Sequence, residues 1–297
     1  METRGRVSLL GVLLVSIVLL AVPACGRQGS KEMDEMVDIG THRLHIRCTG
    51  SGEPTVVIDT GAGDLAAKWY GVQDQLAQVA HVCTYDRAGY GQSEPGPMPR
   101  HVQQAASELK LLLEKADLKG PYVLVGHSLG GLNLQVFAGQ YPGLVAGLVL
   151  FDPAPRDFIS GKAFPDLYHM LKQAGAEMQT DAERLRASSN AEERTKADYV
   201  AAVASEHQSM VADGAAQVAA VASFGDIPLT VVASGKPNPA FGDEAQAYQT
   251  FWIEQSRALA ERSANGTFIL VQESGHHLQV DAPDVVVAAI REMVAKV

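Results

Sequence analysis

Short, almost wholly apolar segments recur along the chain, and they constrain its fold more than any other feature. They lie at residues 55–59, 82–85, 122–125, 147–151, 229–233 and 267–271. Segments this short and this apolar are typical of strands that are covered on both faces, as in a parallel sheet. Sequence with a helical period separates most of them. The pattern therefore predicts an α/β fold with a mostly parallel sheet flanked by helices.

The clearest helical segment follows the strand at 82–85, because its apolar side chains recur every three or four positions. They are Val102, Ala105, Ala106, Leu109, Leu112, Leu113 and Ala116. Residues 36–39 and 43–48 predict two further strands at the start of the domain, and a closing helix is expected from Pro283. Residues 153–225 contain no convincing strand, so they predict a helical insertion.

The first 24 residues are expected to be a secretory signal peptide that is not part of the fold. Residues 7–22 form an apolar run, which Arg4 and Arg6 precede and small residues follow. A basic start, an apolar centre and small residues at the cleavage site are typical of export. The alternative is an uncleaved membrane anchor, although the run is at the short end of what spans a bilayer.

Cys25 directly follows this segment, which resembles a bacterial lipoprotein signal, in which the cysteine becomes the lipidated first residue. Pro23 departs from that motif, and ordinary cleavage after Ala24 is the alternative. We therefore expect a periplasmic or cell-envelope lipoprotein, and otherwise a secreted protein. Residues 25–36 are expected to tether the domain to the membrane.

The balance of charged residues limits which partners the protein can bind. The chain has 24 Lys and Arg residues against 34 Asp and Glu residues, for a net charge of −10. This balance leaves no basic surplus to bind phosphate, so it argues against a nucleic-acid partner. With 46% hydrophobic residues, the chain is also not mainly disordered.

The segment Gly126-His-Ser-Leu-Gly130 carries the most chemical information. It matches G-x-S-x-G, follows an apolar strand and opens a helix, which is the context that this motif requires. Such a turn lifts the serine hydroxyl clear of the sheet and places it at a helix N-terminus, where backbone N–H groups favour negative charge. Ser128 is therefore the candidate nucleophile.

A serine nucleophile needs a base, and the base needs an acid that orients it. His276 directly follows Gly275, in a loop between the last strand and the last helix, and is the candidate base. His277 is the alternative. His127 is adjacent to Ser128 along the chain, so its ring points away from the hydroxyl group.

Together these segments make the chain similar to the α/β-hydrolase superfamily, in the branch with a serine nucleophile and a helical lid. The likeness rests on residues 86–93 (DRAGYGQS), residues 126–130, and Gly275-His276 with Pro283. It covers about residues 37–294. It implies an eight-stranded, mostly parallel sheet, with residues 37–152 and 226–297 as the core and residues 153–225 as the lid.

The resemblance also assigns roles to other residues. It implies an oxyanion hole from the backbone N–H groups of Ala62 and Leu129, although Thr60 stands where the family usually has histidine. The acid is expected at Asp152, directly after the sixth strand. Asp243 and Asp157 are the alternatives, because the loop after the seventh strand has no carboxylate before Asp243.

Cys48 and Cys83 both lie in predicted strands, where they either pair or remain buried thiols. In the sheet order of the family, the second and fourth strands are neighbours. The resemblance therefore favours a disulfide between these two cysteines.

The default reaction of such a site is acyl transfer from a small or medium apolar carboxylic ester, by way of an acyl-enzyme. The same triad also serves amide hydrolysis, as in proline-type aminopeptidases, and lactonase or cofactor-free peroxidase chemistry. A non-catalytic exported binding protein is the alternative from another class. We expect no cofactor and no metal, and the sequence leaves the oligomeric state open.

Overall fold

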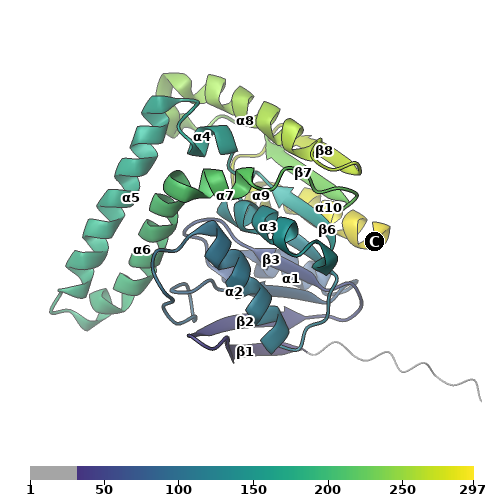
Figure 1. Ribbon diagram of the computed structural model, residues 1–297, viewed down its shortest axis with the longest axis horizontal. Helices are drawn as coiled ribbons and strands as arrows, with labels where there is room; N and C mark the ends of the chain where they lie inside the picture. The colour runs from purple at the N-terminus through teal and green to yellow at the C-terminus, as the bar shows by residue number, and fades with distance from the viewer. Residues whose placement is uncertain (1–31) are drawn as a thin grey trace, which may run out of the picture.

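The computed structural model describes residues 32–297, which form an eight-stranded sheet flanked by helices (Figure 1). The strand order is β1-β2-β4-β3-β5-β6-β7-β8. The strands are β1 (Met33–Asp38), β2 (Arg43–Thr49), β3 (Val56–Asp59), β4 (Val82–Tyr85), β5 (Tyr122–His127), β6 (Val145–Phe151), β7 (Leu229–Ser234) and β8 (Gly266–Val271). Strands β3 to β8 run parallel, and the pairs β1–β2 and β2–β4 are antiparallel. The predicted α/β class with a mostly parallel sheet is confirmed.

The sheet begins earlier than the sequence suggested. Strand β1 starts at Met33, within the segment expected to be a tether, and pairs with β2 from the Met33–Cys48 position onward. Met33 and Val37 are both buried, so their contacts with the core draw this segment into the sheet. The expected signal peptide and Cys25 lie outside the described residues. Within residues 32–297, no helix is both long and apolar enough to cross a bilayer.

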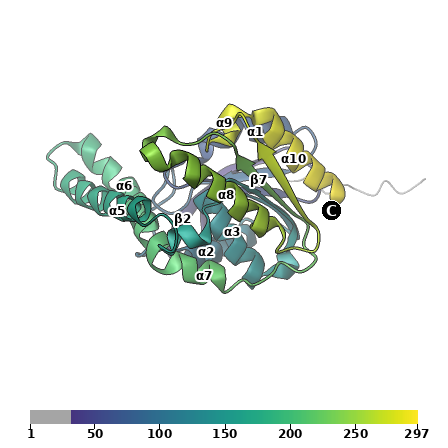
Figure 2. The ribbon, with the colours of Figure 1, turned by 90° about the horizontal axis from the view of Figure 1, so that it is seen from above.

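Side chains of the central strands alternate between two apolar layers, as the two-residue period of a strand requires. Val123 and Val125 of β5 point into one layer, whereas Leu124 points into the other. The first layer packs against α1 (Tyr70–Leu76) and α10 (Pro283–Lys296). The second packs against α2 (Val102–Lys115), α3 (Leu129–Gln140) and α8 (Ala245–Ala260). Figure 2 shows α1 and α10 side by side, with α2 and α3 on the opposite side of the sheet.

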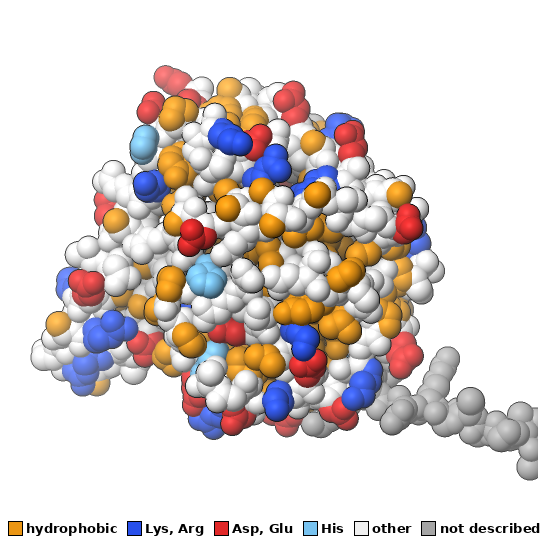
Figure 3. Space-filling view, in the orientation of Figure 1, with side chains coloured by type: hydrophobic (Ala, Val, Ile, Leu, Met, Phe, Trp, Pro, Cys, Tyr) orange, Lys and Arg blue, Asp and Glu red, His pale blue; other side chains and the backbone are white. Residues whose placement is uncertain are grey.

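Residues between β6 and β7 are helical, as expected. They form α4 (Arg156–Ile159), α5 (Pro165–Arg186), α6 (Ala191–Ser209), a π-helical turn (Met210–Gly214) and α7 (Ala215–Ala219). The long helices α5 and α6 pack against each other and project from the body of the protein (Figures 1 and 2). The face drawn in Figure 3 mixes both signs of charge, including on these helices, where Arg186 pairs with Asp198.

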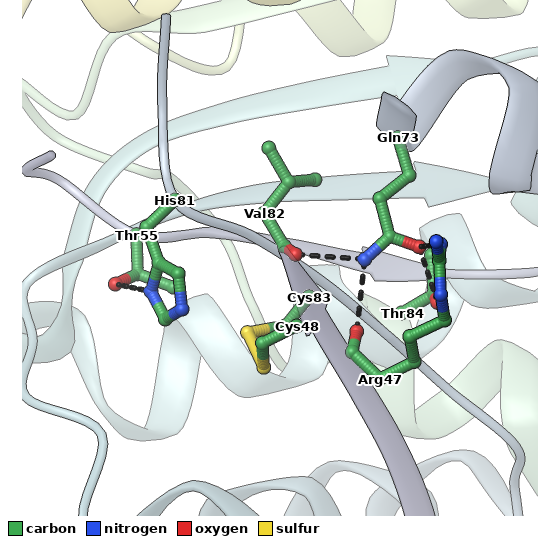
Figure 4. Close-up of a disulfide and its surroundings, with 8 residues drawn as sticks. All are labelled: Arg47, Cys48, Thr55, Gln73, His81, Val82, Cys83 and Thr84. Atoms are coloured by element: carbon green, nitrogen blue, oxygen red, sulfur yellow. Dashed lines mark hydrogen bonds between the residues drawn. A yellow bond between two sulfur atoms is a disulfide. The ribbon is translucent and has the colours of Figure 1, made fainter. Parts of the chain in front are cut away.

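A disulfide joins Cys48 to Cys83 across the antiparallel pair β2–β4 (Figure 4). The two residues are direct partners in the strand register, and both are buried. Gln73 of α1 binds the same two strands, because its Nε2 donates to the carbonyl oxygens of Arg47 at 2.9 Å and Val82 at 2.8 Å. The disulfide and this side chain together hold the antiparallel edge of the sheet to its parallel centre.

Replacing both Cys48 and Cys83 with Ala is expected to lower the free energy of unfolding by about 3 to 4 kcal/mol. The disulfide closes a loop with a sequence separation of 35, which restricts the unfolded chain. Urea unfolding of the oxidised wild type and of the double variant measures the difference. As a control, dithiothreitol should bring the wild type close to the variant. If the reductant leaves the wild type unchanged, the two cysteines do not pair.

Candidate active site

Ser128 occupies a sharp turn between β5 and α3. Its backbone has φ 51° and ψ −116°, a conformation that residues other than glycine rarely adopt. The glycines on either side permit this turn, because the backbone of neighbouring segments lies too close to them for a side chain. A Cβ on Gly126 would lie 2.7 Å from Cα of Gly131, and one on Gly130 would lie 2.2 Å from the carbonyl oxygen of Asp59. The spacing of the motif therefore reflects how tightly α3 packs on the ends of β3 and β5.

Asp152 lies on the neighbouring strand, directly after β6. The backbone N–H of Ser128 donates to the carbonyl of Phe151 at 3.0 Å, so the two strand ends are joined next to both side chains. Asp152 is buried and has a left-handed backbone with φ 46°. Its Oδ2 lies 2.7 Å from Nδ1 of His276. Nδ1 therefore carries the proton donated to this carboxylate, which leaves Nε2 of His276 as the basic nitrogen.

Ser234, at the end of β7, holds the Asp152 carboxylate in place. Its backbone N–H donates to Oδ1 at 2.8 Å, and its hydroxyl donates to Oδ2 at 2.9 Å. Gln249 of α8 in turn donates from Nε2 to the carbonyl of Ser234 at 2.7 Å. Neither Ser234 nor Gln249 was predicted from the sequence to take part in the site. The only available signal was the position of Ser234 at the end of a predicted strand, since all parallel strands end at the same edge of the sheet.

The loop that carries His276 is fixed against the Ser128 turn by His127. Nε2 of His127 donates to the backbone carbonyl of His276 at 2.8 Å, and the two ring centroids lie 4.8 Å apart. Burial, and to a smaller extent the neighbouring His276, lower the pKa of His127 to about 3, so His127 is neutral at pH 7. The ring of Trp252 also makes an edge contact with the ring of His276, and the two ring centroids lie 5.8 Å apart.

The structure places the three candidate acids differently. Of these three, only Asp152 is hydrogen-bonded to His276. Asp243 is exposed in the 3-10 helix Pro239–Glu244, and Asp157 of α4 pairs with Arg156. The alternative base, His277, is half exposed, and its Nδ1 lies 3.7 Å from Oδ2 of Asp64. The geometry therefore favours the Asp152–His276 pair over each alternative.

The loop after β3 contains Ala62, and a buried arginine fixes its backbone. Nη1 of Arg87 donates to the carbonyl of Thr60 at 2.7 Å, and Nη2 donates to the carbonyl of Gly61 at 2.9 Å. This loop lies beside the first turn of α3, because β3 and β5 pair directly at Asp59 and Gly126. Ala62 and Leu129 are thus brought to the same edge of the sheet as Ser128.

Arg87 is itself part of a buried ion network. Its Nη1 also donates to Oδ1 of Asp59 at 2.7 Å, and its Nε and Nη2 donate to the two carboxylate oxygens of Glu206, at 2.7 and 3.0 Å. Burial alone would lower the pKa of Arg87, but the Glu206 and Asp59 carboxylates outweigh it and raise the pKa well above its usual value. Because Glu206 belongs to α6, this network ties the helical insertion to the core.

A family model for the α/β hydrolase fold matches residues 54–232, and the chain belongs to this family. Protein YqjL of Bacillus subtilis is 26% identical over 252 residues, which are 85% of this chain and 87% of that protein. A probable transporter of Hormonema carpetanum is 34% identical over 127 residues, 40% of this chain, but the chain spans only 18% of that protein's length.

Solved structures share the fold. An esterase from Thermogutta terrifontis has a TM-score of 0.65 at 21% identity, over 89% of this chain and 98% of its own. An enol-lactonase from Burkholderia xenovorans has a TM-score of 0.63 at 17% identity, over 88% of this chain and all (100%) of its own.

Replacing Arg87 with Met is expected to lower the free energy of unfolding by about 3 to 5 kcal/mol, because it leaves two buried carboxylates without their cation. Arg184→Met is the matched control. Arg184 pairs with Asp181 on the surface, where both side chains are about 60% exposed, so its loss should cost less than about 1 kcal/mol. Chemical denaturation measures both changes. A cost for Arg87→Met no larger than the control would contradict a central role for this network.

Proposed function

We propose that the protein is a serine hydrolase that cleaves carboxylic esters, with Ser128 as nucleophile, His276 as general base and Asp152 as the orienting acid. The observation that carries the proposal is the 2.7 Å contact between Asp152 and His276, on a loop bonded to the residue before Ser128. A strained serine, a histidine with a free Nε2 and a buried carboxylate are the parts that acyl transfer needs.

The proposed reaction uses these three residues in two steps. Ser128 Oγ attacks the ester carbonyl carbon while His276 Nε2 accepts the hydroxyl proton. The proton then passes to the departing alcohol oxygen, which leaves an acyl group on Ser128. Water, deprotonated by the same nitrogen, attacks this acyl-enzyme, and the proton returns to Ser128 as the acid leaves. The backbone N–H groups of Ala62 and Leu129 are assigned to bind the oxyanion. These donors stabilise negative charge that develops only in the transition state.

The substrate is expected to be a small or medium apolar acyl ester, with residues 153–225 as a lid over the site. Support comes from a run of aromatic contacts that joins the insertion to His276. Phe158 and Phe164 of the insertion contact Tyr248, which contacts Trp252, and Trp252 contacts His276. Tyr199 of α6 also donates to the carbonyl of Gly63, next to Ala62.

Two measurements test the reaction. The purified protein should hydrolyse p-nitrophenyl esters from a panel running from acetate to palmitate, and a fluorophosphonate probe should label it. Ser128→Ala should abolish labelling and lower kcat/KM by at least about 10³-fold, because no other group attacks the carbonyl. If no ester in the panel is hydrolysed above the Ser128→Ala control, the esterase proposal fails. Labelling combined with amide turnover alone would favour a peptidase instead.

The acid is tested by a matched pair of variants. Asp152→Asn should lower kcat by about 10³- to 10⁴-fold, because the amide no longer favours the tautomer with a basic Nε2. Asp243→Asn should leave kcat unchanged, since Asp243 is exposed and is not the carboxylate that bonds to His276. Circular dichroism checks that both variants fold. Loss of turnover only in Asp243→Asn would transfer the acid to that position.

We also propose that the protein is exported and lipidated at Cys25, on the sequence grounds given above. Cells that express it and are fed radiolabelled palmitate should yield a labelled protein in the membrane fraction. Cys25→Ala should abolish this labelling, because it removes the thiol that carries the lipid. Cys48→Ala serves as the control and should keep the label. Label that survives Cys25→Ala would contradict the proposed site.

A further inference from the structure

We propose that Asp64, His127 and His277 form a binding site for a divalent transition-metal cation such as Zn²⁺. The three residues come from three segments: the loop after β3, the end of β5 and the loop after β8. None of them belongs to the proposed triad, and the inference does not depend on the proposed reaction. It departs from the expectation, drawn from the sequence, that the protein binds no metal.

The donor atoms converge with spacing close to that of a metal site. Oδ2 of Asp64 lies 3.7 Å from Nδ1 of His127 and 3.7 Å from Nδ1 of His277, and all three atoms lie within 4.8 Å of one another. Ligand bonds of 2.0–2.1 Å in a tetrahedral site place donor atoms about 3.3 Å apart. The side chain of His277 is 51% exposed, so it has room to move closer to the other two donors.

Two of these donor atoms are buried without a hydrogen-bond partner among the described residues. Oδ2 of Asp64 and Nδ1 of His127 are both in this state, and the residues are 3% and 1% exposed. Leaving a buried polar atom unpaired costs free energy, so such atoms usually serve a ligand or a function. The two atoms lie 3.7 Å apart, and an ion between them would give both a partner.

His127 is already prepared as a ligand. Its Nε2 donates to the carbonyl of His276, which fixes the tautomer and leaves the lone pair of Nδ1 free. Metal-binding histidines characteristically donate their second nitrogen to a carbonyl or carboxylate in this way.

The surroundings leave space for the ion and define its class. A Cβ on Gly61 would lie 2.8 Å from Nδ1 of His127 and 3.4 Å from Oδ2 of Asp64, so the absence of a side chain there keeps the gap open. Lys68 bonds to the other carboxylate oxygen of Asp64, Oδ1, and leaves Oδ2 available. Two imidazoles and one carboxylate suit Zn²⁺ and related ions, whereas Mg²⁺ and Ca²⁺ require oxygen ligands.

Isothermal titration calorimetry of the purified protein, freed of metal by dialysis against a chelator, tests the proposal. Titration with ZnCl₂ at pH 7 should show binding of a single ion per chain at micromolar concentrations, and titration with MgCl₂ should show none. His277→Ala should weaken zinc binding by at least about tenfold. His169→Ala, which removes an exposed histidine on α5, is the matched control and should bind as the wild type does.

A second variant and a second measurement separate loss of the ligand from loss of the fold. Asp64→Asn keeps the shape of the side chain but removes the charge, and should also weaken zinc binding by at least about tenfold. Zn²⁺ should raise the Tm of the wild type and of His169→Ala but not of His277→Ala, because only a ligand of the folded state stabilises it. An absence of zinc binding by the wild type would overturn the proposal, and so would equal binding by His277→Ala.

Discussion

The buried cation of Arg87 is the interaction on which the arrangement of the site depends. Its guanidinium group meets the carboxylates of Asp59 and Glu206 and the carbonyls of Thr60 and Gly61, so it joins β3, the following loop and the helical insertion. A planar group with five donors can satisfy all of these acceptors at once, which a lysine could not do. Removing charges from water is costly, and the network is stable only because each buried carboxylate has a partner.

The second constraint is the edge at which the parallel strands end. Ser128, Asp152 and Ser234 follow or end three neighbouring strands, β5, β6 and β7, and the sheet order alone brings them side by side. Both Ser128 and Asp152 have left-handed backbones, which the tight packing of α3 and the hydrogen bonds of Asp152 hold in place. Backbone strain of this kind persists only where the surrounding structure fixes it, and it concentrates at functional sites.

Much of this arrangement could be predicted from local sequence. The apolar stripe from Val102 to Ala116 is buried throughout, and the apolar strand segments lie in the sheet within a few residues of their expected bounds. Strand β1 was expected over residues 36–39 but begins at Met33, because its pairing with β2 extends it into the expected tether. Ser234, Gln249 and Glu206 could not be found, since each acts through a partner that is distant in the chain. Helix α6 gives no local sign that Glu206 will be buried against Arg87.

By itself, the sequence determined the α/β class and the residue types at the turn around Ser128, because periodicity and steric demands of glycine act over a few residues. Only the tertiary structure decided which acid meets His276 and how its carboxylate is held. The same holds for the convergence of Asp64, His127 and His277. Hydrogen bonds and metal coordination depend on distances of a few ångströms between segments that are far apart in the chain, and packing alone sets those distances.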